Sequence, residues 1–225
     1  MARSFRRTVR RFLRHRKGVS AIEFAIGAPL VILLFLMGVD TIRFVIATEK
    51  IDDVATTISQ VISQNQTGSV TYVDLQFYHD VAMVIFPQIL ADAKQRNMSW
   101  SNDIDIGMAS VKFTATTANC GASCVYIPQM VWAGGSSPRS CVVPLLAASD
   151  TAQPSPITLP KDAFGPGSIT IVDVAYNFRP TIAPFFLQTI PIRRSYYMAP
   201  RYVPLIKYQT IAGDNGIAAP CPAFV

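Results

Sequence analysis

The sequence predicts an α+β fold, in which a long N-terminal helix and a shorter second helix pack on an antiparallel β-sheet. Three observations support this. Residues 19–39 are almost entirely apolar, residues 40–64 repeat apolar side chains with helical spacing, and β-branched and aromatic residues dominate from Ile104 onward. Of the 225 residues, 50% are hydrophobic, which is enough for one sizeable core outside the membrane segment. We therefore expect one outer domain.

The first segment, Met1–Gly18, is strongly basic. It holds eight of the 20 basic residues and no acid, so the remaining 12 basic residues face 14 acidic ones. The net charge of +6 therefore belongs to a short tail and does not indicate a nucleic-acid-binding face. Basic residues beside a membrane helix stay in the cytoplasm. We expect a cytoplasmic N-terminus and an exported chain after about Thr41.

Residues 19–39 form the expected transmembrane helix, in which Glu23 is the only charged residue. At a rise of 1.5 Å per residue the segment is roughly 32 Å long, which spans a bilayer. A secretory signal peptide is the alternative, but the apolar stretch is longer than usual and no A-x-A-like site follows it. At the far end, Asp40 and Arg43 stand three residues apart and can form an ion pair on one helix face.

Glu23 needs a reason to lie within an apolar helix. One reason is helix capping, because Ser20–Glu23 has the S-x-x-E pattern of a capping box. The other is a cut after Gly18, which would give Val19 a new ammonium group about one helical turn from the Glu23 carboxylate. The two explanations are compatible, since a cap at Ser20 would leave the residues before it non-helical and accessible to a peptidase.

Two helical segments are expected before the strands. The first continues from the membrane to about residue 65, with an apolar stripe formed by Ile51, Val54, Ile58 and Val61. The second covers Tyr72–Gln95, and Pro87 kinks or restarts it. Its apolar face is expected to contain Phe77, Val81, Val84 and Ile85.

Four later segments predict strands of an antiparallel sheet: Asp103–Thr117, Cys124–Trp132, Ser168–Phe178 and Ile192–Val203. Gly, Pro and Ser clusters at 134–138 and 149–167 predict loops. The second loop is long enough to contact partners.

All four cysteines lie in the part of the chain that is expected to be exported: Cys120, Cys124, Cys141 and Cys221. Their even number and location favour two disulfides in an oxidising compartment, with three pairings open. The spacing of Cys120 and Cys124 also fits a zinc site, but export favours disulfides.

The sequence contains little evidence for a catalytic or metal site. The two histidines, His15 and His79, fall in the leader and on a helix, so no His-based triad or zinc-protease motif can be built. Asp103 and Asp105 could bind a metal, although acids on the solvent face of a strand are commoner. The run 193–197 could stack on single-stranded nucleic acid, but an amphipathic strand is the stronger interpretation. We expect no enzyme activity, no cofactor and no metal.

The start of the long helix resembles a known family. A basic leader, a glycine, and a Glu-Phe pair in the register G-x(4)-E-F are similar to the class III signal of type IV prepilins. More narrowly, residues 16–60 resemble TadE-like minor pseudopilins of the tight-adherence (Flp) pilus system. The positions that carry this resemblance are Gly18, Glu23, Phe24, Pro29, Gly38, Asp40 and Arg43.

The resemblance implies three parts: a cleaved cytoplasmic leader at residues 1–18, a transmembrane and amphipathic helix at 19–65, and a periplasmic pilin-like α+β domain at 66–225. It implies a minor pseudopilin of the bacterial inner membrane that initiates or caps an adhesive Flp pilus. The expected partners are a prepilin peptidase, the major Flp pilin, other minor pseudopilins and inner-membrane platform proteins.

The resemblance also assigns roles to residues. Gly18 and Val19 would flank the peptidase cut, and Glu23 and Phe24 would act in assembly. The alternative is an uncleaved bitopic inner-membrane protein whose periplasmic domain binds a ligand or partner.

Overall fold

The computed structural model describes residues 17–118, 120–121, 124–180 and 188–222, with side chains from Ile22 onward. The chain divides into two compact units, and the boundary lies inside helix α2 (Lys17–Ser63), between Val45 and Ile46. The second unit contains the β-sheet and the remaining helices.

Three helices precede most of the strands: α2, α3 (Tyr72–Ile85) and α4 (Gln88–Gln95). A short 3-10 turn, η1 (Trp100–Asn102), leads into the sheet, and a second one, η3 (Lys161–Ala163), lies in the long loop. The strands are β1 (Ser69–Val70), β2 (Ile104–Ala115), β3 (Tyr126–Gly135), β4 (Leu146–Ala148), β5 (Thr158–Pro160), β6 (Gly167–Phe178), β7 (Ile190–Met198), β8 (Lys207–Tyr208) and β9 (Ala218–Pro220).

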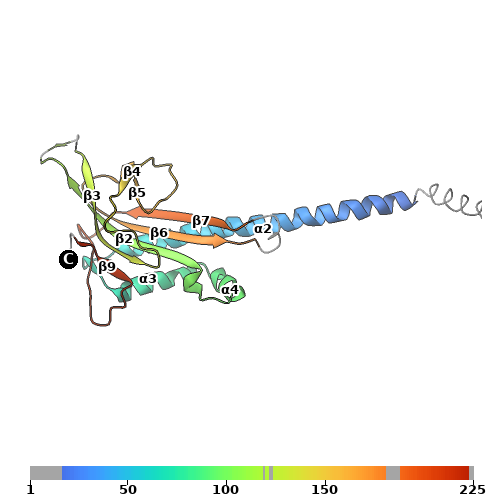
Figure 1. The fold of residues 1–225 in the computed structure, drawn as a ribbon, viewed down its shortest axis with the longest axis horizontal. Helices are drawn as coiled ribbons and strands as arrows, with labels where there is room; N and C mark the ends of the chain where they lie inside the picture. The colour runs from blue at the N-terminus through green and yellow to red at the C-terminus, as the bar shows by residue number, and fades with distance from the viewer. Residues whose placement is uncertain (1–16, 119, 122–123, 181–187, 223–225) are drawn as a thin grey trace, which may run out of the picture. The chain divides into compact units, whose positions relative to one another are not determined.

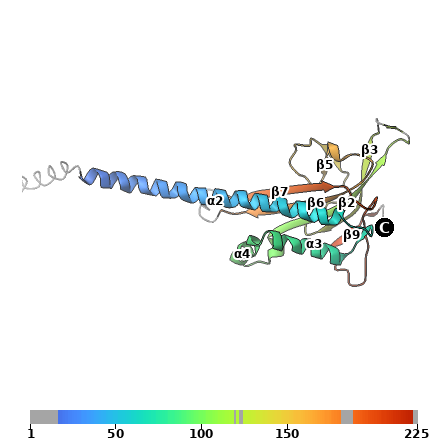
Figure 2. The same cartoon turned by 180° about the vertical axis from the view of Figure 1, so that it is seen from behind.

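The main sheet has five antiparallel strands in the order β7-β6-β2-β3-β9. Two small parallel pairs, β1-β8 and β4-β5, lie outside it. Figure 1 shows this sheet in front of the C-terminal part of α2, and Figure 2, from behind, shows α2, α3 and α4 on the near side. The predicted α+β class and antiparallel sheet are confirmed.

One face of the sheet packs on the helices. The apolar stripe of α2 is fully buried and consists of Ile51, Val54, Ala55, Ile58 and Ile62. Opposite it, β2 and β6 contribute buried side chains at alternate positions, Ile104, Ile106 and Met108 with Val172, Val174 and Tyr176. The phenol of Tyr176 donates a 2.5 Å hydrogen bond to Asp92 of α4. The core on this face therefore combines side chains with helical spacing from α2 and alternate side chains from β2 and β6.

The other face of the sheet is covered by the chain between β3 and β6. Its core contains Ala109, Val111, Phe113, Met130, Ala133, Leu145, Leu159, Ile171 and Cys221. A register shift between Ser110 and Val111 makes Val131 the extra residue of a β-bulge in β3. The predicted loop at 149–167 thus includes β5 and contributes the buried Leu159 and the partly buried Phe164 to this core.

The apolar face of α3 that contains Phe77 and Val84 is not the face that packs on the protein. Phe77 is 61% exposed and Val84 is 77% exposed. The side chains that α3 buries are Leu75, Tyr78, His79 and Ala82. Burial lowers the pKa of His79, and the nearby Asp80 carboxylate only partly opposes this. The predicted restart at Pro87 is confirmed, because α3 ends before it and α4 begins after it.

The β2-β3 end of the sheet depends on glycine at position 135. Gly135 has φ +99°, and a Cβ there would collide with the carbonyl of Ile106. Gly165 lies in open space, where a Cβ would meet nothing within 4 Å. Gly165 is therefore a suitable control for a substitution at Gly135.

We predict that Gly135→Ala lowers the free energy of unfolding by at least about 2 kcal/mol, because it adds backbone strain and a backbone clash. Gly165→Ala should stay within about 0.5 kcal/mol of the parent. Denaturant unfolding of the full chain in detergent micelles, followed by the fluorescence of buried Trp132, measures both. Equal stability of the two variants would contradict this view of the strand end.

Candidate functional site

The N-terminal part of α2 presents an apolar surface. An 18-residue window within Ile22–Ser63 has a mean hydropathy of 2.3, and none of it is buried inside the protein. Phe24 is 75% exposed, Ile26 72% and Phe35 71%. A continuous apolar helix of this length fits a single membrane span or a pilin-type helix that packs on other helices.

The predicted assembly residues lie at the start of this surface. Glu23 and Phe24 are both exposed on α2. The backbone is already helical at Lys17 and stays helical through Gly18 and Val19. This corrects the expectation that a cap at Ser20 begins the helix and leaves the preceding residues non-helical. The side chains of Gly18 and Val19 lie outside the described residues.

The apolar segment of α2 contains a proline and two glycines, residue types that are uncommon inside an isolated helix. Pro29 lies inside the helix, and its missing N–H leaves the carbonyl of Ala25 without its usual intrahelical donor. A Cβ added at Gly27 or Gly38 would meet nothing within 4 Å. Close packing against the described residues of this chain therefore does not require glycine at either position, although each glycine weakens an isolated helix.

At the far end of the apolar segment, Asp40 and Arg43 form the predicted ion pair. Arg43 Nη1 lies 3.7 Å from Asp40 Oδ1, and the Asp40 side chain is only 1% exposed. Thr41 donates its hydroxyl to the carbonyl of Met37 at 2.8 Å. The polar end of the span is thus partly neutralised within the helix.

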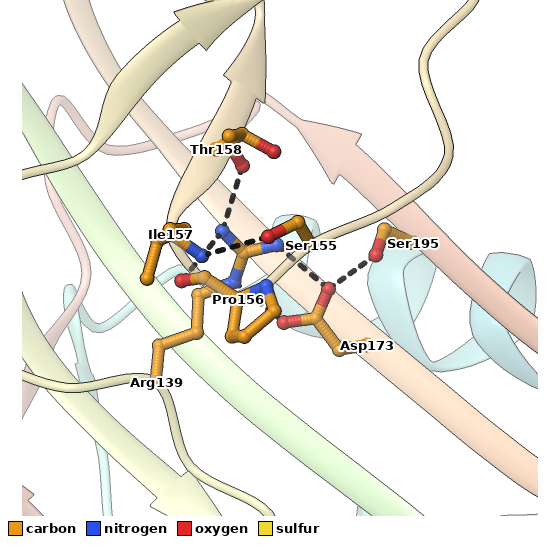
Figure 3. Close-up of polar contacts among 7 residues, drawn as sticks. All are labelled: Arg139, Ser155, Pro156, Ile157, Thr158, Asp173 and Ser195. Atoms are coloured by element: carbon orange, nitrogen blue, oxygen red, sulfur yellow. Dashed lines mark hydrogen bonds and ion pairs between the residues drawn. The ribbon is translucent and has the colours of Figure 1, made fainter.

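A second group of polar side chains lies on the loop-covered face of the sheet. Arg139 donates to both carboxylate oxygens of Asp173, from Nε at 2.6 Å and from Nη2 at 2.8 Å. Its Nη1 donates to the carbonyls of Pro156 at 3.3 Å and Thr158 at 3.0 Å, and Ser195 donates to Asp173. Figure 3 shows the guanidinium between the loop and β6.

This cluster acts as a structural clamp. The Arg139 side chain is 1% exposed. Burial alone would lower the pKa of Arg139, but the hydrogen bonds and charge of Asp173, with a smaller contribution from Tyr197, outweigh it and raise that pKa. Because Arg139 already occupies the carboxylate, the Ser195–Asp173 contact lacks the free base that a nucleophilic serine requires. No local sequence pattern predicts this pairing, since the partners are 34 residues apart.

The four cysteines form two disulfides, Cys120–Cys124 and Cys141–Cys221. This is one of the three pairings that the sequence left open. The second bond spans 80 residues, and Cys221 also donates its amide to Val131 of β3 at 2.9 Å. It therefore ties the C-terminal segment to the sheet.

Asp103 and Asp105, the two candidate metal ligands, have different surroundings in the structure. Asp105 is exposed on β2, as expected, but Asp103 is buried in an ion pair with Arg96. Among the described residues, no group of three or more His, Cys, Asp or Glu side chains could hold a metal ion. The run 193–197 lies in β7, as the strand interpretation predicted.

Residues 18–58 match the family of TadE-like proteins. The N-terminal region of this chain is TadE-like. The match covers α2 from Gly18 to within its buried stripe and includes Glu23, Phe24, Asp40 and Arg43. TadE-like proteins are tied to the biogenesis of the Tad pilus and are generally non-enzymatic. Comparisons with curated proteins and with solved structures found no match.

The Arg139 clamp yields a stability prediction. Arg139→Leu should lower the free energy of unfolding by about 3 kcal/mol, because it leaves the Asp173 carboxylate without its buried cation. The double change Arg139→Leu with Asp173→Val should be less damaging than the single one, since both partners are removed. Exposed Arg193→Leu is the control and should cost less than about 0.5 kcal/mol. Denaturant titration that ranks the double variant lowest would contradict the clamp.

Proposed function

We propose that this protein is a minor pseudopilin of a Tad-type pilus, which a prepilin peptidase matures and which initiates or caps pilus assembly. One observation carries the proposal: the G-x(4)-E-F register, Gly18 to Phe24, stands at the head of a 47-residue helix inside the TadE-like stretch. An exposed apolar helix, followed along the chain by a folded domain, suits a subunit that assembles through helix packing. The major pilin, other minor pseudopilins and platform proteins are its proposed partners.

The proposed location is the bacterial inner membrane, with the leader in the cytoplasm and the domain in the periplasm. The basic leader supports this orientation through the positive-inside rule. The two disulfides in the outer domain are consistent with an oxidising compartment.

A second candidate is an uncleaved single-span protein with a partner-binding outer domain. It is favoured by the helical backbone across Gly18 and Val19, because proteolytic cleavage concentrates in open, non-helical segments. The identity of the mature N-terminus separates the two functions.

We predict that the mature protein begins at Val19 when a prepilin peptidase is present. Intact-mass measurement of the protein purified from peptidase-positive and peptidase-negative cells tests this. Gly18→Leu should block processing, because a peptidase that selects glycine has no room for the branched side chain. Gly27→Leu, in open space on the same helix, should be processed normally. Retention of residues 1–18 in peptidase-positive cells would reject the pseudopilin assignment.

We further predict that the Glu23 charge acts in association with partner pilins. An unpaired acid in the bilayer costs up to about 3 kcal/mol, and the new ammonium of Val19 would lie about one helical turn away. Glu23→Ala should leave processing and export intact but reduce recovery of partner pilins roughly five-fold, which corresponds to about 1 kcal/mol.

The control and a second variant define the mechanism. Glu49→Ala, exposed on α2 beyond the apolar segment, should not change recovery. Glu23→Gln separates the charge from the size and hydrogen-bonding capacity of the side chain, because glutamine keeps both but is neutral. Equal loss with Glu23→Gln and Glu23→Ala would show that the charge is needed, whereas normal recovery with both would reject charge pairing.

A further inference from the structure

The sheet has an open edge at β7. Among the described residues, β7 pairs with β6 on one side only, over Ile190 to Met198. In an antiparallel ladder every second residue of an edge strand turns its N–H and C=O outward. These groups form a template for an additional strand. An edge of nine residues is long enough for a short peptide segment.

Two pockets follow this edge on the loop-covered face. The first, of about 230 Å³, is lined by Asp105, Asp173, Arg193 and Ser195, with Pro154 and Pro156 from the loop. The second, of about 150 Å³, is lined by Asp150, Ser195 and Tyr197, again with Pro154. Positions 193 and 195 of β7 therefore line the larger pocket, and positions 195 and 197 line the smaller one. Their separation of two residues, about 7 Å, is the period of side chains on one face of a strand.

The outer wall of both pockets is held in place. Arg139 fixes Pro156 and Thr158 through their carbonyls and Asp173 through its carboxylate. Ser195, which lines both pockets, donates to the same carboxylate. A partner would therefore meet preformed pockets, which reduces the entropy cost of binding.

The two pockets differ in charge. Asp150 is the only charged residue that lines the smaller pocket, beside the polar side chains of Ser149, Ser195 and Tyr197. In the larger pocket, Asp173 is already paired with Arg139, and Arg194 Nε lies 3.6 Å from Asp52 of α2, so that Asp105 and Arg193 remain as one acid and one base. The smaller pocket is thus complementary to a cation, and the larger one to an uncharged side chain.

We propose that the β7 edge binds an extended segment of another polypeptide as an added strand. The segment places a lysine or arginine in the Asp150 pocket and an uncharged side chain, two residues away, in the pocket between Asp173 and Arg193. Pairing through the backbone supplies affinity and the alternate pockets supply specificity. Pro191 and exposed Arg193 make the edge unsuitable for indiscriminate pairing.

The proposed partner is a different polypeptide with a basic extended segment, because the charged side chain that lines the smaller pocket is the carboxylate of Asp150. A second copy of this chain is the competing occupant, and the oligomeric state of the chain during the binding test separates the two.

The test uses synthetic peptides and the full chain in detergent micelles. The probe is a nine-residue peptide of alternating threonine and valine with one central lysine. A second peptide has glutamate in place of lysine, and a third keeps the lysine but is N-methylated at alternate amides. Fluorescence anisotropy measures binding, and hydrogen exchange with mass spectrometry reports protection of β7.

We expect the lysine peptide to bind and to protect the β7 amides, and N-methylation to weaken binding at least ten-fold. Asp150→Lys should weaken the lysine peptide about ten-fold and strengthen the glutamate peptide. Asp80→Lys, exposed on α3, should change neither. The proposal is overturned if N-methylation has no effect, if Asp150→Lys acts no differently from Asp80→Lys, or if β7 is protected only by dimerisation of the chain itself. These outcomes do not depend on whether the leader is cleaved.

Discussion

The rest of the structure depends on one constraint: helix α2 is apolar and exposed in its N-terminal part but has to pack on the sheet in its C-terminal part. The N-terminal part of α2 is apolar on all sides and exposed, whereas the C-terminal part is amphipathic and buries one stripe of side chains, from Ile51 to Ile62. That stripe covers the helix face of the sheet. Without it, the alternating apolar side chains of β2 and β6 would lose their cover. The same element that carries the apolar surface therefore also completes the core of the folded domain.

The two faces of the sheet are covered by different means. Helices cover one face, where regular periodicity supplies a continuous apolar stripe. The chain between β3 and β6 covers the other with little regular structure, so that specific links hold it. The Arg139 clamp fixes the middle of this segment, and the Cys141–Cys221 bond joins its start to the C-terminal strand region. In the chain-entropy model, a bond that closes a loop of 80 residues contributes roughly 4.5 kcal/mol.

The extent of the TadE-like match has a functional consequence. It covers residues 18–58, which are the apolar surface and most of the buried stripe. These are the parts of the chain that the proposed assembly would share with other subunits. The sheet, the clamp and the β7 edge lie beyond the match. Under our proposal, contacts common to the machinery are made by α2, and contacts individual to this protein are made by the outer face of its domain.

The sequence by itself determined the elements that depend on local periodicity and composition. The apolar helix, the α2 stripe, the Asp40–Arg43 pair and the four long strands all follow from spacing within one segment. The strand bounds were predicted to within a few residues, and β-branched runs between Gly and Pro clusters explain why. The family resemblance of the N-terminal helix also came from local register, because its marked positions lie within a few helical turns of one another.

Only the tertiary structure decided which surfaces meet. Helix α3 is apolar around much of its circumference, so its periodicity could not choose between the face with Phe77 and the face with Leu75. The cysteine pairing, the burial of Asp103 and the Arg139–Asp173 clamp join segments far apart in the chain, and no local pattern encodes such contacts. The sequence likewise did not predict that β7 is an edge strand, because the sequence of a strand does not show whether other strands pair with it on one side or on both. These features arise from long-range packing, whose free energy outweighs local preference.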